Sequence, residues 1–281
     1  MSSTHTLITV APTGAETAKS DAPDLPVTLE ELVATGVACE AAGAALIHVH
    51  IRDADARPTL DVARLSDTVA ALRAATSLVV QLSTGGSVHD PLEARLAVLD
   101  AEPDSCSLTC GTVNFGEDVF LNPWPFMVEL YQLTQSREVV PEFELFDLGQ
   151  VHALNRLLDQ EGLPYGGHVH CDLVMGVPGG MPGTAEALVA AVRALPPGAS
   201  WSATGVGRST LPVALAALSA GGHLRVGMED TLTFRRGEPV RDNAQLVERA
   251  AELATLAQRP PMTTAQAHEL LRTKDRTGVA A

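Results

Sequence analysis

The sequence predicts an α/β fold, a (β/α)8 TIM barrel followed by one extra C-terminal helix. Short strand-like runs alternate with longer stretches rich in Ala, Leu, Glu and Arg along the whole chain, which is the pattern of βα units around a parallel sheet. Eight such units can be counted, with short connections and no change of composition along the 281 residues. An open doubly wound sheet rarely needs eight regular units, so the pattern favours a closed barrel.

The expected strands are short apolar runs, and each is followed by a helical stretch. In chain order the strands are Leu7–Ala11, Ala45–Ile51, Leu78–Thr84, Ser105–Cys110, Glu142–Asp147, His168–Met175, Ser200–Val206 and Leu224–Met228. Several of the helices open with a Pro or with a capping Thr or Asp. They are expected to start near Thr28, Val62, Pro91, Pro123, Gly149, Thr184, Leu211 and Asn243.

A last helical stretch, Thr264–Thr273, lies beyond the breaker Arg259-Pro260-Pro261. We therefore expect a single catalytic domain over residues 1–281, with residues 259–281 as a C-terminal extension. Leu270 and Leu271 in this helix need a surface to cover them, which predicts a homo-oligomer, a dimer or a tetramer. The alternative is that the helix caps its own barrel.

Composition limits the class of partner. With 46% apolar and 19% charged residues, the chain has the balance of a globular protein with a large aliphatic core. A net charge of −15 argues against nucleic acid and against anionic membranes, which need a positive surface. The N-terminal residues do not resemble a signal peptide, and no run approaches 18 apolar residues. We expect a cytoplasmic protein that acts on a small molecule.

The cysteines are expected to have no chemical role. Cys39, Cys106, Cys110 and Cys171 lie inside apolar runs and lack the spacing of a metal finger. We expect small buried thiols at these positions.

The second strand ends in a candidate metal site. A barrel carries its active site at the C-terminal ends of its strands, and the period of two places His48, His50 and Arg52 on one face. Two imidazoles two residues apart on a strand can bind one cation, and Zn²⁺ or a similar borderline metal suits their nitrogen atoms. Hydrogen-bonded core histidines are the alternative.

Two carboxylates follow the eighth strand, which must close the barrel next to the first. Buried acids such as Glu229 and Asp230 need a cation or a hydrogen-bond partner, and a metal shared with His48 and His50 would supply one.

A rival metal site lies on the sixth strand. His168, His170 and Asp172 share one face of that strand. No equally good carboxylate follows them, so this group ranks second.

Further polar side chains end strands three to five on one face of each strand. They are Ser83, Ser107, Thr109, Glu142 and Glu144. Glycines follow Ser83 closely, and they let a ligand approach the backbone. We expect these side chains to face a substrate. The alternatives are helix N-caps for the hydroxyls and a salt-bridged rim position for Glu142.

The loop after the seventh strand, Gly205-Val206-Gly207-Arg208, is a candidate phosphate site. Barrels often bind phosphate in their last two βα loops, so Gly205, Gly207 and Arg208 are expected to hold the phosphates of a cofactor. A tight turn explains the Gly-x-Gly spacing equally well.

Together these motifs resemble the β-keto acid cleavage enzyme family over almost the whole chain. The matching segments, in order, are Thr13-Gly14-Ala15-Glu16, Pro26-Val27-Thr28-Leu29-Glu30-Glu31, Ala42-Gly43-Ala44-Ala45, His48-Val49-His50-Ile51-Arg52-Asp53, Pro58-Thr59, Ser83-Thr84-Gly85-Gly86, Gly111-Thr112-Val113-Asn114-Phe115, Pro141-Glu142-Phe143-Glu144-Leu145-Phe146-Asp147, Gly205-Val206-Gly207-Arg208 and Gly221-Gly222-His223-Leu224-Arg225-Val226-Gly227-Met228-Glu229-Asp230. The resemblance implies a zinc-dependent barrel that condenses a β-keto acid with acetyl-CoA and releases acetoacetate and a new acyl-CoA.

The resemblance also implies roles for individual residues. His48, His50 and Glu229 would bind Zn²⁺, and Asp230, with Arg225 beside it, would act as the base. The substrate would contact Ser83, Ser107 and Glu144, with Thr109 on the same face as Ser107, and Glu16 would face an ammonium group.

The expected substrate is therefore 3-keto-5-aminohexanoate, an intermediate of lysine degradation, and the expected acyl product is 3-aminobutyryl-CoA. One alternative is a metal-dependent aldolase or decarboxylase that uses no CoA. Another is a non-catalytic barrel that only binds a metabolite.

Overall fold

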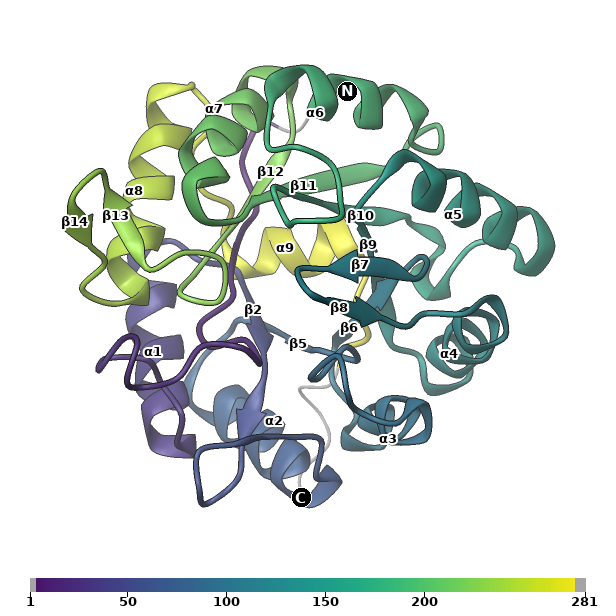
Figure 1. Cartoon of the computed structure of the whole chain (residues 1–281), viewed down its shortest axis with the longest axis horizontal. Coiled ribbons are helices and arrows are strands. Elements are labelled where there is room, and N and C mark those ends of the chain that lie inside the picture. Colours follow the sequence, from purple (N-terminus) through teal and green to yellow (C-terminus); the bar gives the residue numbers. More distant parts are fainter. Residues whose placement is uncertain (1–3, 276–281) are drawn as a thin grey trace.

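The computed structural model describes residues 4–275, and its centre is a closed barrel of eight parallel strands (Figure 1). β1 pairs with both β2 and β12, and this pairing closes the barrel. The expected TIM barrel is therefore confirmed. Around the barrel the strands are β1 (Ile8–Val10), β12 (His223–Val226), β11 (Ser200–Gly205), β10 (His170–Met175), β9 (Val140–Leu145), β6 (Ser105–Thr109), β5 (Val79–Leu82) and β2 (Leu46–Val49).

Helices surround the barrel, and each begins within one residue of its expected start. They are α1 (Leu29–Ala42), α2 (Val62–Ala75), α3 (Leu92–Ala97), α4 (Trp124–Arg137), α5 (Leu148–Glu161), α6 (Ala185–Ala194), α7 (Thr210–Ala220) and α8 (Asn243–Leu256). Short 3-10 segments are η1 (Val98–Ala101), η2 (Tyr165–Gly167) and η3 (Gly207–Ser209). Capping side chains fix several starts, because Thr28, Asp61 and Asp147 each accept a hydrogen bond from the backbone N–H three residues on.

Small hairpins that the sequence did not predict extend three of the strand ends. β3 (Ile51–Arg52) pairs with β4 (Pro58–Thr59), β7 (Val113–Phe115) with β8 (Asp118–Phe120), and β13 (Thr233–Arg235) with β14 (Glu238–Pro239). The expected strand Ala45–Ile51 was too long, since β2 stops at Val49 and the chain resumes as β3 after His50. All three hairpins follow barrel strands, so they stand at the carboxyl-terminal rim.

Alternation along the strands separates an apolar layer from a polar interior. Ile47, Val49 and Leu108 are fully or almost fully buried in the main hydrophobic cluster, which includes residues of the surrounding helices. His48 and Ser107, at the opposite parity, are also buried, but their partners are polar. The period of two therefore places the reactive side chains inside the barrel.

The final helix, α9 (Thr264–Leu271), closes the amino-terminal end of the barrel (Figure 1). Leu271, which is 2% exposed, packs in one cluster with Leu7, Leu46 and Val79 from the starts of the strands. The barrel-cap alternative is thus confirmed, and the need to cover Leu270 and Leu271 no longer argues for an oligomer. Residues 276–281 of the expected extension lie outside the described residues.

Two further expectations concern single features. All four cysteines are free and buried, as expected. Within residues 4–275, none of the helices is both long and apolar enough to cross a membrane.

Candidate active site

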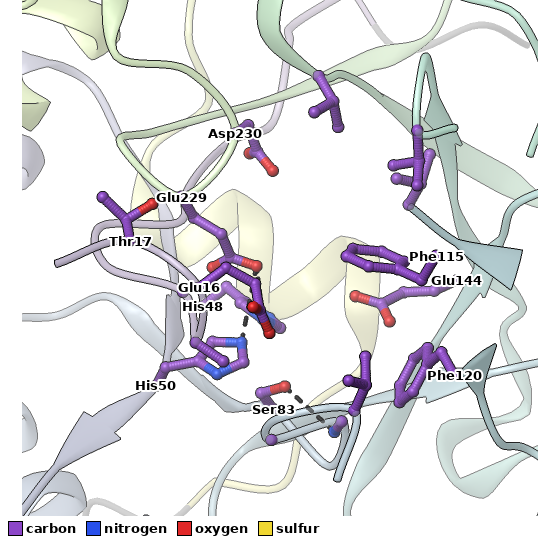
Figure 2. A pocket seen from close by; sticks show the side chains of 18 of the residues that line it. Glu16, Thr17, His48, His50, Ser83, Phe115, Phe120, Glu144, Glu229 and Asp230 are labelled. Atoms are coloured by element: carbon purple, nitrogen blue, oxygen red, sulfur yellow. Dashed lines mark hydrogen bonds and ion pairs between the residues drawn. The ribbon is translucent and has the colours of Figure 1, made fainter. Parts of the chain in front are cut away.

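A cavity of about 250 Å³ opens at the carboxyl ends of the strands, and its two walls differ in chemistry (Figure 2). The polar lining residues, here called the polar wall, are Glu16, His48, His50, Ser83, Glu144, Arg225, Glu229 and Asp230; of these, Glu144 lies beside Phe115 and Phe120 (Figure 2). The apolar wall consists of Val88, Phe115, Phe120, Phe146, Val174, Val177 and Val206. Figure 2 shows His50 and Glu229 on one side of the cavity and Phe115 and Phe120 on the other.

His48, His50 and Glu229 form a group that could hold a metal ion. One potential ligand atom from each residue lies within 4.8 Å of the other two. The Nε2 atoms of His48 and His50 lie 3.9 and 3.6 Å from Oε1 of Glu229. Oε2 of Glu229 is buried and has no hydrogen-bond partner. Two imidazoles and a carboxylate with an unpaired oxygen are a suitable donor set for Zn²⁺ or a similar divalent cation.

The ring of His48 is held by a hydrogen bond to the side chain of Gln81. Nδ1 of His48 lies 2.5 Å from Oε1 of Gln81, which can only accept, so Nδ1 carries the proton and Nε2 presents its lone pair to the cavity. Burial, and then the charge of Arg225, lowers the pKa of His48 to about 4. The imidazole is therefore neutral at pH 7, as a metal ligand must be.

The loop after β1 lets Glu229 enter the site. Gly14 has a φ of +66°, and a Cβ there would stand 2.6 Å from Cγ of Glu229, so a larger residue would displace the carboxylate. Arg52 holds this loop by donating to the carbonyl oxygens of Gly14, Ala15 and Thr17. Arg52 therefore fixes the position of the loop that adjoins Glu229.

Arg225 joins three carboxylates of the polar wall. Its guanidinium donates to Glu229 at 2.6 Å, to Asp230 at 3.2 Å and to Glu144 at 3.3 Å. Burial alone would lower the pKa of Arg225, but Asp230 and then Glu229 raise it well above its ordinary value. Burial alone would raise the pKa of Glu229, but Arg225, His50 and His48 hold it well below its usual range. Arg225 and Glu229 are thus both charged.

Asp230 has the pKa of a potential base. Burial raises its pKa to about 6, although Arg225 opposes the rise. The side chain is 6% exposed and lines the cavity. At pH 7 most of the carboxylate is ionised, and it binds a proton more readily than an ordinary Asp does.

The remaining predicted substrate contacts divide into two groups. Ser83, Glu16 and Glu144 line the cavity, whereas Ser107 and Thr109 do not. Oγ1 of Thr109 donates to Glu144 at 2.8 Å. Burial raises the pKa of Glu144, and Arg225 and the Thr109 bond oppose this. Thr109 therefore lies behind a cavity carboxylate.

Ser107 lies deeper in the barrel than Thr109, and its polar groups bind Thr84. It accepts from the N–H of Thr84, and its carbonyl accepts from the Thr84 hydroxyl. These bonds hold the segment that follows Ser83.

Glu16 is exposed at the cavity rim. Lys19, the nearest basic residue in sequence, pairs with Glu31 at 2.6 Å. Burial lowers the pKa of Arg52 and the charge of Glu16 opposes this, so Glu16 has a cationic neighbour, but no ion pair between them is described and the exposed carboxylate can contact a ligand.

The rival metal group on the sixth strand does not gather into a metal site in the described part of the chain. Ser200 binds both His168 and His170, and Asp172 accepts from Thr204. Glu142 lies 3.2 Å from His170 and is 2% exposed. The rim alternative for Glu142 is therefore wrong, because β9 places this residue inside the barrel.

The two glycines of the predicted phosphate loop make backbone contacts within the fold. The N–H of Gly207 donates to the carbonyl of Asp230 at 2.7 Å, and a Cβ on Gly205 would stand 2.4 Å from the carbonyl of Ser209. Arg208 is exposed and lines a neighbouring groove formed by residues 176–184, Ser209 and Pro212. The tight-turn alternative thus describes the glycines, and Arg208 alone stays available for an anion.

Sequence reasoning missed Gln81 and most of the apolar wall. Gln81 has the same parity as Ser83, so period-two alternation was the signal that could have found it. Phe115 and Phe120 lie on the unpredicted β7–β8 hairpin. Phe115 ends one of the segments that carry the family resemblance, but no role was predicted for it.

Comparison with known proteins identifies the family of this chain. The model of the beta-keto acid cleavage enzyme family matches residues 5–272. The 3-keto-5-aminohexanoate cleavage enzyme of Acetoanaerobium sticklandii is 36% identical, over 94% of this chain and 97% of its own length. The 3-oxoadipate:acetyl-CoA acetyltransferase of Cupriavidus necator is 35% identical, over 94% of each chain.

A solved structure supports the fold alone. The binary complex of ObcA with oxaloacetate superimposes with a TM-score of 0.77 at 21% identity, over 89% of this chain and 68% of that chain. The full-length match to the family model and the identity to the curated relatives establish that this chain belongs to the beta-keto acid cleavage enzyme family.

Proposed function

We propose that this enzyme transfers the acyl part of a β-keto acid to the CoA of acetyl-CoA and releases acetoacetate. We further propose that its active site holds a divalent metal and that this metal is Zn²⁺. The observation that carries the proposal is the convergence of His48, His50 and Glu229 with the Arg225–Asp230 pair around one cavity. Two relatives that match nearly the whole chain support it, since the one from Acetoanaerobium sticklandii is named for cleavage of a β-keto acid and the one from Cupriavidus necator for acetyl transfer between acetyl-CoA and a β-keto acid.

The charges of the site support a metal there. Among the buried groups, the Arg225 guanidinium faces the carboxylates of Glu144, Glu229 and Asp230. Buried charge that is not balanced is costly, and a dication would neutralise the excess. A bound metal would chelate the keto and carboxylate oxygens of the substrate and lower the pKa at C2.

Asp230 supplies the base for the first step. Its carboxylate lines the cavity beside the proposed metal ligands but is held by Arg225. It takes a proton from C2 of the β-keto acid, and the carbanion at C2 attacks the carbonyl carbon of acetyl-CoA. The thioester C–S bond breaks, and CoA leaves as the thiolate.

The second half of the reaction consumes the CoA thiolate and regenerates the carboxylate of Asp230. The CoA thiolate attacks the original keto carbon of the substrate, the bond between C2 and C3 breaks, and C2 recovers the proton from Asp230. The products are acetoacetate and a new acyl-CoA. Arg225, at 3.2 Å from the carboxylate, stabilises Asp230 each time it returns to its charged form.

Glu16 supports an amino-bearing side chain on the substrate. It stands at the rim on the same side of the cavity as His50 and Glu229 (Figure 2), and no basic residue neutralises it through a described ion pair. A carboxylate in this position would stabilise an ammonium group. We therefore propose 3-keto-5-aminohexanoate as the substrate, with 3-aminobutyryl-CoA as the acyl product of this step of lysine degradation.

The groove beside Arg208 is the proposed path for CoA. Val177 lines both the cavity and this groove, which has a volume of about 480 Å³. The thioester would lie in the cavity while the phosphates reach Arg208. The exposed guanidinium of Arg208 would attract a phosphate locally, against the repulsion of a chain with a net charge of −15.

Acetoacetate release from a panel of β-keto acids, with and without acetyl-CoA, tests the proposal. We expect release only with acetyl-CoA, and the highest kcat/KM for 3-keto-5-aminohexanoate. Turnover without acetyl-CoA would identify an aldolase or decarboxylase. No turnover of any panel member would refute the proposed reaction.

A further inference from the structure

We propose that Gln81 is a positioning residue that fixes the tautomer and orientation of the metal ligand His48. The inference rests on the proposed metal site. Gln81 is fully buried on β5, directly beside His48 on β2 in the strand register. Its Oε1 lies 2.5 Å from Nδ1 of His48. Gln81 therefore contacts the ring nitrogen of His48 other than the one near Glu229.

The amide of Gln81 is itself oriented. Its Nε2 donates to Oγ of Ser105 at 3.1 Å, on the next strand of the barrel. If the amide flipped, an N–H would face Nδ1 of His48, which could accept it only with the ring proton moved to Nε2, and Nε2 would then have no lone pair for a metal. With Ser105 accepting from Nε2, the acceptor oxygen of Gln81 faces the imidazole, and a chain of two hydrogen bonds leads from β6 to the metal ligand.

The consequence for the ligand is geometric. With Nδ1 protonated, Nε2 is the only nitrogen of His48 with a lone pair, and it faces Glu229. Without Gln81, the buried ring could turn or adopt the other tautomer, and Nδ1–H would lose its acceptor. Partners of metal-bound histidines commonly contribute 10- to 100-fold to metal affinity.

Zn²⁺ affinity of the full-length protein tests this role, measured by competition with a chromophoric chelator. We expect Gln81→Leu to bind Zn²⁺ about 10- to 100-fold more weakly than the wild type. Gln81→Glu keeps an acceptor oxygen toward Nδ1–H, so its affinity should stay within a few-fold of the wild type. If Gln81 only filled space, Gln81→Leu would bind Zn²⁺ at least as well as Gln81→Glu, because Leu packs without a charge whereas Glu buries one.

Gln150→Leu is the matched control. Gln150 is a second buried glutamine, and it binds the N–H of Phe146 and the carbonyl of Gly111 without touching a proposed ligand. Its replacement should lower stability and leave Zn²⁺ affinity unchanged. Equal losses of affinity in Gln81→Leu and Gln150→Leu, or no loss in Gln81→Leu, would overturn the inference.

Two further outcomes are distinguishable. If the variants of Gln81 do not fold, Ser105→Ala decides, because it leaves Gln81 in place and only frees its amide. We expect a several-fold loss of affinity, and an unchanged affinity would overturn the inference. If the wild type binds no Zn²⁺, the metal site of the proposed function fails, and the role of Gln81 fails with it.

Discussion

Nη2 of Arg225 lies 2.6 Å from Oε1 of Glu229, the same oxygen that faces His48 and His50. The guanidinium also holds Asp230. The proposed metal ligand Glu229 and the proposed base Asp230 are adjacent in sequence, and both line the cavity. One cation, Arg225, therefore orients both carboxylates. Metal content and turnover are separate measurements, so the two functions can still be tested separately.

Removing the imidazoles should remove the metal. We expect about one divalent metal per chain in protein purified without chelator, and very little in the double variant His48→Ala, His50→Ala, because Glu229 alone is a weak ligand set. Elemental analysis measures this. His168→Ala, on the rival strand, should keep the wild-type content. Unchanged metal in the double variant would contradict the assignment.

Removing the base should slow turnover and spare the metal. Asp230→Asn preserves shape but cannot accept the C2 proton, so kcat should fall by about 10²–10⁴-fold. Metal content should stay near that of the wild type. Asp104→Asn is a suitable control, because Asp104 binds Arg73 and the N–H of Val80 and does not line the cavity. Near-normal turnover of Asp230→Asn would move the base elsewhere, with Glu144 the next candidate.

Neutralising Glu16 should change specificity. Glu16→Gln should lower kcat/KM for 3-keto-5-aminohexanoate by about 1.5–3 kcal/mol, the contribution of a hydrogen bond to a charged group. An uncharged β-keto acid of similar length should be affected little. Steady-state kinetics on both substrates compare the two losses. Equal losses would show that Glu16 shapes the loop and does not recognise an ammonium group.

Acid should destabilise the barrel through His223. Its Nδ1 accepts from the N–H of Leu7, and burial lowers its pKa to about 3. The unfolded chain therefore binds a proton near pH 6.5 that the folded chain does not bind, so stability falls as the pH drops from about 6.5 toward 3. One such histidine changes the free energy of unfolding by at most about 1.4 kcal/mol per pH unit.

Urea denaturation at pH 7 and pH 5 tests this contribution. In His223→Gln the amide oxygen can still accept from Leu7, but the titrating group is gone. We expect a smaller difference between the two pH values than in the wild type. The same difference in both proteins would exclude His223 as a source of acid sensitivity.

Local patterns were enough to predict the barrel. Strand alternation placed His48 and His50 on the inner face, and capping residues such as Thr28 placed the helix starts. These features depend on neighbours in sequence, so they are visible before folding. They also brought Glu229 and Asp230 to the correct end of the barrel, where the structure joins them to the histidines.

Long-range contacts were not predictable in the same way. Ser107 has the inward parity of a cavity residue, but it lies one layer too deep and binds Thr84. Arg95, on α3, reaches the carbonyl of Thr84 and lies over the rings of Phe120 and Phe126. Depth inside a barrel depends on how far each strand is staggered against the next, and the sequence of one strand does not contain that information.

The position of α9 has a consequence for how the chain reaches its native state. Leu7, near the start of the chain, and Leu271, near its end, belong to one cluster. During synthesis the apolar floor under β1, β2 and β5 therefore stays uncovered until the segment that forms α9 has been made. Contacts so distant in sequence form slowly, and uncovered apolar surface favours aggregation in the meantime. The closing of the floor is thus expected to be a late event in folding, and truncated chains that lack this helix should depend most on chaperones.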